Sequence, residues 1–176
     1  MGPRELIIRR AQPAESDAVA ALSRISRETA LPYLADVHTR EDDREFFRDR
    51  VFTTCEVWVA ERDGVLAGFC AFREGWVDHL YVHPEHHRTG VGSALLRTAM
   101  AANEALQLWT FQRNMNARAF YEAHGFACVK TTDGRDNEER EPDALYTWSR
   151  SSRATRSRAS PAKRAANRGF KPNACR

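Results

Sequence analysis

The segment LYVHPEHHRTGVGSALL (80–96) gives the clearest indication of fold in this sequence. An apolar run predicts a strand, and the pattern changes after a turn to helical spacing, with Gly90 and Gly92 at the helix start. Glycines there let ligand oxygens approach the backbone, while unpaired N–H groups and the helix dipole attract anions. His87 and Arg88 strengthen the positive potential. The segment therefore predicts a pyrophosphate site; for two glycines alone, a tight turn without a ligand is the alternative.

Two common phosphate-binding motifs do not fit this segment. In a Rossmann unit the glycines follow the first strand, and an acidic residue comes about 20 positions later. Here the glycines follow the fourth predicted strand, after an antiparallel hairpin. A Walker loop requires Gly-Lys followed by Ser or Thr, and the sequence contains no such tripeptide. The glycines therefore belong to a different kind of phosphate-binding turn.

The residues up to Val82 predict four strands and two helices. Asp63-Gly64 is a strong hairpin signal because both residues tolerate positive φ. Thr39 and Asp42 have the spacing of a capping box at a helix start. The expected strands are 4–11, 55–62, 65–72 and 76–82; the expected helices run from 16 through 25 and from 39 through 51, with an irregular stretch at 31–39.

The residues after the glycines predict two more helices and three more strands. One helix begins at Gly90, and a second covers 114–124 and ends at Gly125, which readily adopts the left-handed conformation. The expected strands are 106–112, 126–132 and 144–148, the last two separated by a polar loop. This order predicts an α/β (α+β) fold with a mixed sheet and helices on both faces.

The charges of the chain divide at about residue 150. The whole sequence has 27 Lys and Arg against 24 Asp and Glu, a formal net charge of +3. Residues 150–176 hold nine of the basic residues and no acidic one, which leaves 18 basic and 24 acidic residues in 1–149. We therefore expect one acidic domain at 1–149 and a basic, disordered tail at 150–176. The acidic domain excludes a basic nucleic-acid-binding fold, although the positive total suggests one.

Cysteines and histidines do not predict a metal site or disulfides. The four cysteines are far apart and form no CxxC pair, which indicates free or buried thiols. Four histidines lie within nine residues, but one falls in a strand and three fall on the glycine-containing turn, so we expect no bound metal. No apolar stretch is long enough to span a bilayer and no signal-type segment follows Met1, so we expect a cytoplasmic protein.

A second motif, NMNARAFYEAHGF (114–126), follows the next predicted strand. Asn114, Ala117 and Tyr121 lie at i, i+3 and i+7 and share one face of the helix. The two motifs together resemble the GNAT superfamily of acetyl-CoA-dependent N-acetyltransferases, whose phosphate loop reads (Gln/Arg)-x-x-Gly-x-(Gly/Ala) and whose later helix reads Asn-x-x-Ala-x-x-Phe-Tyr-x-x-x-Gly-Phe. HRTGVG (87–92) and 114–126 match in order and spacing, and the resemblance covers residues 4–149. One departure is His87 at the Gln/Arg position, which can donate a hydrogen bond but lacks a fixed charge.

The resemblance implies a mostly antiparallel, splayed sheet with acetyl-CoA between the strands at 76–82 and 106–112. The pantetheine arm of acetyl-CoA would pair like an extra strand with the backbone of Leu80, Tyr81 and Val82. The second helix would contact the cofactor through Asn114 and Ala117. The expected pyrophosphate-binding residues are His87, Arg88, Thr89, Gly90, Val91, Gly92 and Ser93.

The implied reaction is direct attack of a primary amine on the thioester in a ternary complex, for which no cysteine is needed. A lysine-like amine has a pKa of about 10.4 and must lose a proton before it attacks. The oxyanion needs a donor, for which a backbone N–H near residues 80–82 is the candidate. The leaving thiolate, with a thiol pKa of about 8.5, departs faster if an acid protonates it.

Two side chains are candidates for the proton transfers. Tyr121 matches the position of the acid in the family motif, and the alternative is an aromatic side chain packed at a helix end. Asp78 lies on the strand that would line the cleft and, by alternation, shares a face with Leu80. Asp78 is therefore our candidate base, with a structural role as an equal alternative. His79, on the opposite face, is the second choice.

The sequence does not identify the acceptor. The loops at 31–42 and 133–148, which mostly set specificity in the family, contain acids that would suit a cationic amine, although solvated loop acids are the alternative: Asp36, Glu41, Asp42, Glu138, Glu139 and Glu141. We expect a small-molecule or peptide amine as acceptor, and a homodimer is plausible by resemblance. A module that binds acyl-CoA or nucleic acid without transferring a group is the alternative function; the tail predicts only weak, nonspecific nucleic-acid binding.

Overall fold

The computed structural model describes residues 5–35 and 38–150. Seven strands form one sheet in the order β1-β2-β3-β4-β5-β7-β6, and β4–β5 is the parallel pair among antiparallel neighbours. The predicted mixed, mostly antiparallel sheet is therefore confirmed. The strands are β1 (Leu6–Arg10), β2 (Glu56–Arg62), β3 (Val65–Arg73), β4 (Trp76–Val82), β5 (Ala105–Phe111), β6 (Ala127–Thr131) and β7 (Asp143–Ser149).

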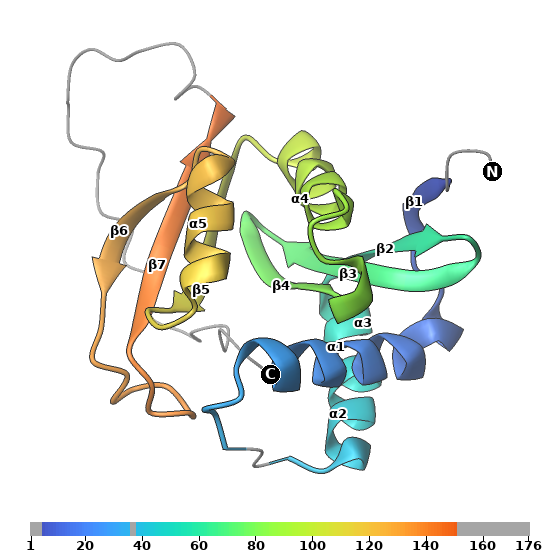
Figure 1. The fold of residues 1–176 in the computed structure, drawn as a ribbon, viewed down its shortest axis with the longest axis horizontal. Coiled ribbons are helices and arrows are strands. Elements are labelled where there is room, and N and C mark those ends of the chain that lie inside the picture. Colours follow the sequence, from blue (N-terminus) through green and yellow to red (C-terminus); the bar gives the residue numbers. More distant parts are fainter. Residues whose placement is uncertain (1–4, 36–37, 151–176) are drawn as a thin grey trace.

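The helices lie close to their predicted positions (Figure 1). Thr39 Oγ1 accepts from the Asp42 N–H at 3.1 Å, and the Asp42 carboxylate accepts from the Thr39 N–H at 2.7 Å, so the predicted capping box is present. The helices are α1 (Ser16–Ala30), α2 (Arg40–Phe46), α3 (Phe52–Thr54), α4 (Val91–Ala102) and α5 (Met115–Ala123); short 3₁₀ turns occupy η1 (Pro13–Glu15) and η3 (Pro84–His86), and a π-helical turn occupies η2 (Phe47–Val51).

Both faces of the sheet are covered, as the order of elements predicts. Alternation along β2 shows this, because Val57 and Val59 pack with residues of α1 and η2, whereas Ala60 packs with residues of α4. The side of α4 and α5 carries the larger core cluster, which also includes buried residues of β5 and β7. Helices therefore pack against each half of the sheet, on both sides of the point where β4 and β5 separate.

The strands β4 and β5 are joined at one end only. Trp76 is the residue of β4 that pairs with β5, opposite Gln107, and the Gln107 N–H donates to the Gly75 carbonyl at 2.8 Å. Beyond this point the two strands separate, and Figure 1 shows the two halves of the sheet fanning apart. The predicted splay is therefore present, between the strands for which it was expected.

A β-bulge in β4 changes the environment of Asp78. Ala71 of β3 lies opposite His79 and Phe72 lies opposite Val77, so Asp78 has no partner across the ladder. Alternation is interrupted here, because Val77 and Leu80 both pack against the core cluster on the α4 side. Because the bulge interrupts the alternation, simple alternation no longer determines which face of the sheet Asp78 shares with Leu80.

Gly68 lies where β3 passes beneath α4, at a point of close approach. A Cβ at this position would lie 2.9 Å from the Tyr81 carbonyl oxygen and 3.0 Å from Val91 Cγ1. Because backbone cannot yield as a side-chain tip can, Gly68→Ala should lower the free energy of unfolding by about 1–3 kcal/mol. Urea denaturation measures this loss. Val65→Ala, at an exposed position of the same strand, is the control and should cost less than about 1 kcal/mol.

Arg150, the first residue of the predicted basic tail, contacts the end of α4. Its guanidinium donates to the carbonyls of Met100, Ala101 and Asn103 at 3.0–3.3 Å. A cation at a helix C-terminus satisfies carbonyls that lack helical partners. The rest of the expected tail, with Cys175, lies outside the described residues. Among the described residues, none of the helices is long and apolar enough to cross a membrane.

Candidate active site

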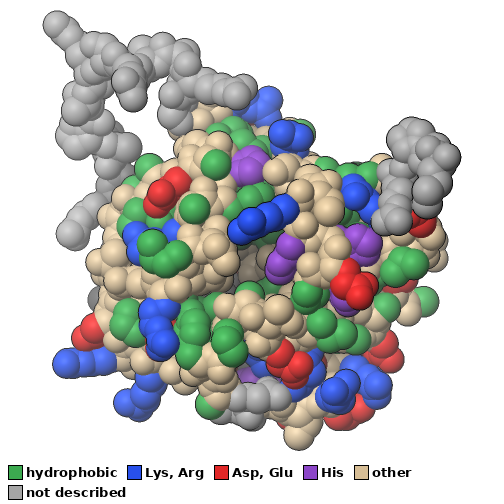
Figure 2. Space-filling view, in the orientation of Figure 1, with side chains coloured by type: hydrophobic (Ala, Val, Ile, Leu, Met, Phe, Trp, Pro, Cys, Tyr) green, Lys and Arg blue, Asp and Glu red, His purple; other side chains and the backbone are tan. Residues whose placement is uncertain are grey.

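A cleft of about 770 Å³ opens where β4 and β5 separate. Its walls come from these two strands, the start of α4, the first turns of α5 and the end of α1. Figure 2 shows a hollow near the centre of one face, bordered by basic and histidine side chains. We refer to this cavity as the cleft.

Most of the predicted site residues line this cleft. Both candidate catalytic residues, Asp78 and Tyr121, are among them. Thr89 and Val91 are not, and the Val91 side chain is fully buried in the core, so only its backbone can face a ligand. The predicted cofactor-binding residues that line the cleft are Leu80, Tyr81, Val82, His87, Arg88, Gly90, Gly92, Ser93, Asn114 and Ala117.

The last residues of β4 do not all present their backbone groups to the gap between β4 and β5. His83 N–H donates to the Ala67 carbonyl at 2.8 Å, so these two residues form a hydrogen-bonded pair of the antiparallel β3–β4 ladder, and every second pair along the ladder does the same. Alternation then directs the backbone groups of Tyr81 toward β3 and those of Leu80 and Val82 toward the gap. The backbone that can pair with an extended ligand is therefore that of Leu80 and Val82, whereas Tyr81 lines the cleft without a free edge.

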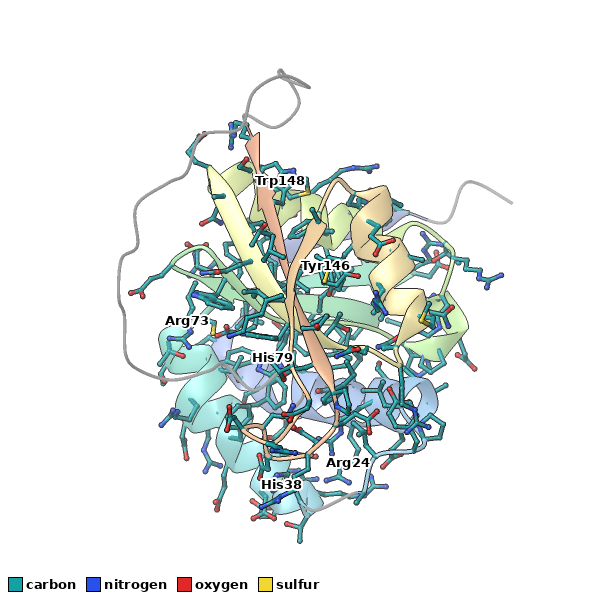
Figure 3. The ribbon with its side chains drawn as sticks, turned by 90° about the vertical axis from the view of Figure 1, so that its left-hand side faces the viewer. Arg24, His38, Arg73, His79, Tyr146 and Trp148 are labelled. Atoms are coloured by element: carbon teal, nitrogen blue, oxygen red, sulfur yellow. The ribbon has the colours of Figure 1, made fainter. Side chains whose placement is uncertain are left out.

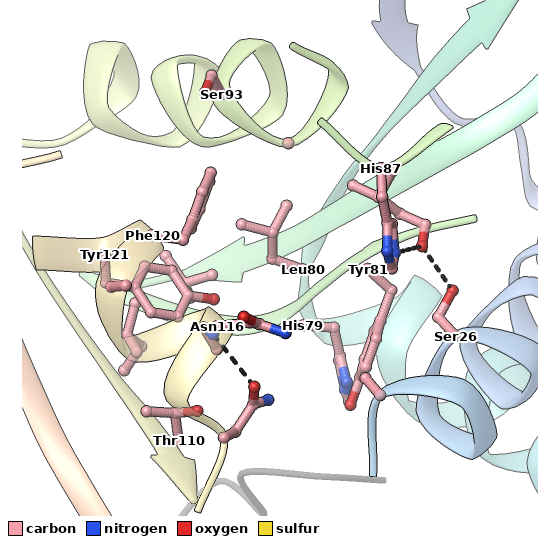
Figure 4. A pocket seen from close by; sticks show the side chains of 18 of the residues that line it. Ser26, His79, Leu80, Tyr81, His87, Ser93, Thr110, Asn116, Phe120 and Tyr121 are labelled. Carbon is pink, nitrogen blue, oxygen red and sulfur yellow. Dashed lines mark hydrogen bonds between the residues drawn. The ribbon is translucent and has the colours of Figure 1, made fainter. Parts of the chain in front are cut away.

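The Val82 carbonyl already accepts two hydrogen bonds (Figure 4). Ser26 Oγ, from α1, donates to it at 3.0 Å, and His87 Nε2 lies 2.9 Å from the same oxygen. Because a carbonyl only accepts, His87 Nε2 carries the proton, and the other ring nitrogen is left for a ligand. Ser26 was missed by sequence reasoning, because a serine on an amphipathic helix carries no signal for a partner 56 residues away.

The start of α4 has the properties of an anion site. Gly90 has a φ of 86° and caps the helix without a side-chain hydrogen bond, so no side chain satisfies the first N–H groups. The preceding turn is held by Thr89, whose hydroxyl donates to the His86 carbonyl at 2.6 Å and whose carbonyl accepts from Arg62 at 3.1 Å. Uncapped N–H groups, the helix dipole and Arg88 together favour a phosphate at this position.

A histidine in the second motif contacts this helix start. His124 Nδ1 lies 2.7 Å from the Phe120 carbonyl and therefore carries a proton, and His124 Nε2 lies 3.0 Å from Ser93 Oγ. The contact joins the end of α5 to the first turn of α4. His124 was not among the predicted site residues, although it stands directly before the motif glycine, Gly125.

Two residues of the second motif, Asn114 and Tyr121, have different structural roles. Asn114 caps the helix, because its side-chain oxygen accepts from the Ala117 N–H at 3.1 Å, which gives the Asn-x-x-Ala spacing a local explanation. Tyr121 is 8% exposed and packs against Phe120 and Phe126. Its hydroxyl points toward the centre of the cleft, on the side where Leu80 lies (Figure 4).

Asp78 is held by one of its two oxygens. Arg73 Nε donates to Oδ2 at 2.6 Å, and Cys55 Sγ donates to the same oxygen at 3.3 Å. Oδ1 is buried and has no hydrogen-bond partner among the described residues. Burial and the nearby Asp78 charge raise the pKa of Cys55 to about 12, so the thiol stays protonated and continues to donate. A buried oxygen without a donor is a place where an amine or a water would be stabilised.

His79, the second choice for the base, is buried among aromatic side chains. Its ring lies 5.4–6.5 Å, between centroids, from four neighbours: Phe46, Phe47, Phe69 and Tyr81. Among the described residues, no His, Cys, Asp and Glu side chains come together in a group that could hold a metal ion.

Comparison with known proteins identifies the class to which this fold and cleft belong. The sequence model of the acetyltransferase (GNAT) domain matches residues 53–128. Peptidyl-lysine N-acetyltransferase YiaC of Escherichia coli is 31% identical over 143 residues, which are 81% of this chain and 96% of that protein. The chain belongs to the GNAT family and is an N-acetyltransferase. This result favours the enzymatic prediction over a module that binds without transferring a group.

Solved structures agree on the fold. A GCN5-related N-acetyltransferase from Rhodopseudomonas palustris superposes with a TM-score of 0.69 at 22% identity, covering 85% of this chain and 98% of that chain. The PaiA N-acetyltransferase from Thermoplasma acidophilum, solved in complex with coenzyme A, gives a TM-score of 0.61 at 17% identity, covering 82% of this chain and 99% of that chain. At these identities the likeness concerns the fold.

Proposed function

We propose that acetyl-CoA is the acetyl donor and that a primary amine attacks its thioester directly, in a ternary complex. The observation that carries this proposal is the meeting of three features in one cleft: an uncapped helix start, an unpaired strand edge and a buried carboxylate. The first two fit the pyrophosphate and the amide-containing arm of coenzyme A. The third fits the amine.

We place the pyrophosphate on the N–H groups at the start of α4. In this arrangement Val91, Gly92 and Ser93 contribute backbone, and Arg88 contributes charge. Thr89 contributes backbone only, because its hydroxyl is bonded to His86. The pantetheine amides pair with Leu80 and the Val82 N–H, since the Val82 carbonyl already has two donors.

The three proton and charge requirements of the reaction fall to three groups. Asp78 Oδ1 takes the amine proton, directly or through a water, because this oxygen has no other partner among the described residues. The backbone N–H of Leu80 stabilises the oxyanion, which leaves the Leu80 carbonyl and the Val82 N–H for the pantetheine amides. The Tyr121 hydroxyl, which points into the cleft, gives a proton to the departing thiolate.

A lysine side chain in a protein is the acceptor that we propose to test first. Support comes from YiaC, which is named as a peptidyl-lysine N-acetyltransferase and aligns over most of both chains. A long, flexible alkyl amine can also reach a buried carboxylate such as Asp78, whose side chain is 8% exposed. The other acceptor class is a small amine metabolite, for which the cleft alone gives no preference.

Two measurements test the proposed function. Acetyl-CoA binding is followed by calorimetry, and thiol release is followed after adding peptides that contain one lysine or a panel of alkyl amines. Micromolar binding with amine-dependent thiol release supports the proposal. Tight binding of acetyl-CoA without thiol release, for any amine, would support a binding module instead.

His87→Arg should tighten acetyl-CoA binding about three- to tenfold at pH 8. The guanidinium is always charged and can contact phosphate with two donors, whereas the His87 ring presents a single nitrogen to a ligand while the other is bonded to the Val82 carbonyl. Calorimetry in 0.15 M salt measures the change. His83→Arg is the control, because it adds the same charge on a side chain that does not line the cleft. Weaker binding by His87→Arg would mean that the ring contact with the Val82 carbonyl matters more than charge.

A further inference from the structure

We infer that the acceptor pocket accepts an amine with a single positive charge and gives no advantage to polycations such as polyamines or aminoglycosides. This inference deepens the proposed function and rests on it. It opposes the simpler interpretation of the sequence, in which the acid-rich loops attract a cationic acceptor. The argument depends on where the acidic side chains of these loops are directed.

The acids near the first loop are engaged within the fold. Asp42 bonds the Thr39 backbone and hydroxyl as a helix cap. Asp43, the next carboxylate, forms an ion pair at 2.7 Å with Arg24, a side chain that is 6% exposed. Glu41 lies 3.3 Å from Arg44 on the same helix. Asp36 is outside the described residues.

The acids of the second loop are also directed inward. Glu138 Oε1 lies 3.0 Å from His38 Nε2, which ties this loop to the segment before α2. Glu141 Oε1 lies 3.6 Å from Arg113 Nη1. Figure 3 shows Arg24 and His38 together at the lower end of the molecule. These contacts tie the second loop to neighbouring segments, and neither Glu138 nor Glu141 lines the cleft.

Glu139 and Asp143 are two further acids of the second loop. Burial raises the pKa of the Glu139 carboxyl above its ordinary value, so this group is not an exposed anion. Asp143 is 2% exposed and accepts hydrogen bonds from Thr132 and Asn137. Neither residue lines the cleft, so neither carboxylate is placed to bind a second ammonium group of a substrate there.

Within the cleft, Asp78 is the one acidic side chain among the described lining residues. Its charge is balanced by Arg73, and the rest of the lining combines neutral polar, basic and apolar residues, the last including Leu31, Leu108 and Trp109. One ammonium can bind at Oδ1. A second ammonium would lose hydration without gaining a partner, or would stay in solvent where salt screens it.

A matched pair of small amines tests this inference. Putrescine and N-acetylputrescine have similar lengths and differ by one charge, and a second pair consists of capped peptides with one lysine or with two adjacent lysines. The expected kcat/KM for the singly charged member equals or exceeds that of the doubly charged member, after correction for the number of amines. A shift from 0.05 to 0.5 M salt should change the ratio less than threefold.

The opposite result is well defined. A more than tenfold preference for putrescine, spermidine or an aminoglycoside, lost at high salt, would overturn the inference and leave the transferase proposal intact. Failure of every amine to release thiol, despite acetyl-CoA binding, would instead contradict the proposed function. The two failures are therefore distinguishable in one set of assays.

Adding a carboxylate to the cleft gives a second test. Thr29 is an exposed residue near the end of α1 that lines the cleft, and its hydroxyl donates to the Ile25 carbonyl of its own helix. Thr29→Glu should raise kcat/KM for putrescine relative to N-acetylputrescine about two- to fivefold, the range expected for a partly screened ion pair. Thr29→Gln is the matched control and should leave this ratio unchanged. Equal ratios in both variants would contradict the inference.

Discussion

Tyr121→Phe should lower kcat by about 10²–10³-fold while acetyl-CoA affinity stays within about twofold of the wild-type value. The ring packs against Phe120 and Phe126 and is almost completely buried, so phenylalanine preserves the shape of this side of the cleft. What is lost is the hydroxyl that points into the cleft. Steady-state kinetics with a saturating amine measure kcat, and calorimetry measures acetyl-CoA binding.

Tyr146→Phe is the matched control for this variant. The Tyr146 hydroxyl donates to Glu122 at 2.7 Å and accepts from Arg118 at 3.0 Å, and the residue does not line the cleft. Its loss should lower the free energy of unfolding by about 1–2 kcal/mol and leave kcat within about twofold. If Tyr121→Phe behaves in the same way, the tyrosine has a packing role and not a catalytic one.

Asp78→Asn should lower kcat/KM at pH 7 by about 10²–10⁴-fold, because an amide cannot accept the amine proton. Asparagine is nearly isosteric and can still accept the Arg73 hydrogen bond through its oxygen, so the bulge in β4 should be preserved. The effect should therefore appear in activity, with a melting temperature close to that of the wild type. Asp49→Asn, at an exposed carboxylate paired with Arg48, is the control and should retain activity.

The pH dependence gives the Asp78 variant a distinctive result. An amine with a pKa of about 10.4 deprotonates in solution as pH rises, so the requirement for a base becomes smaller. The kcat/KM of Asp78→Asn should increase about tenfold per pH unit below this value, and its deficit relative to the wild type should shrink. A deficit that does not change between pH 7 and pH 10 would indicate a structural role for Asp78.

The fold could be predicted because its signals are local. Period-two apolar runs, the Asp63-Gly64 turn and the glycines at 90 and 92 each depend on residues close in sequence, and the structure contains the corresponding strands, hairpin and helix start. The order of the two motifs along the chain then indicated the family. One local feature could not be seen: the bulge at Asp78 inserts a single residue, and the apolar pattern of β4 gives no sign of it.

Most of the predicted site residues line the cleft, but the contacts that hold them were not predicted. Sequence reasoning found Asp78 and His87 but not what holds them. Ser26 meets the Val82 carbonyl across 56 residues, and Cys55 meets Asp78 across 23 residues. Pairings of this kind depend on how helices pack on the sheet, for which no sequence-local pattern exists. The same reason explains why the acids of the loops at 31–42 and 133–148 suggested attraction of a cationic acceptor, although several acids in or near these loops contact basic or histidine side chains.

The separation of β4 and β5 has a consequence for how this protein avoids aggregation. An unpaired strand edge is normally a hazard, because any passing extended chain can pair with it. Here the unpaired edge lies in the interior of the sheet, between strands that are joined at Trp76 and covered by helices. A strand of a second protein would have to enter the cleft between these helices before it could pair with β4, whereas the outer edge of a sheet is open to any extended chain.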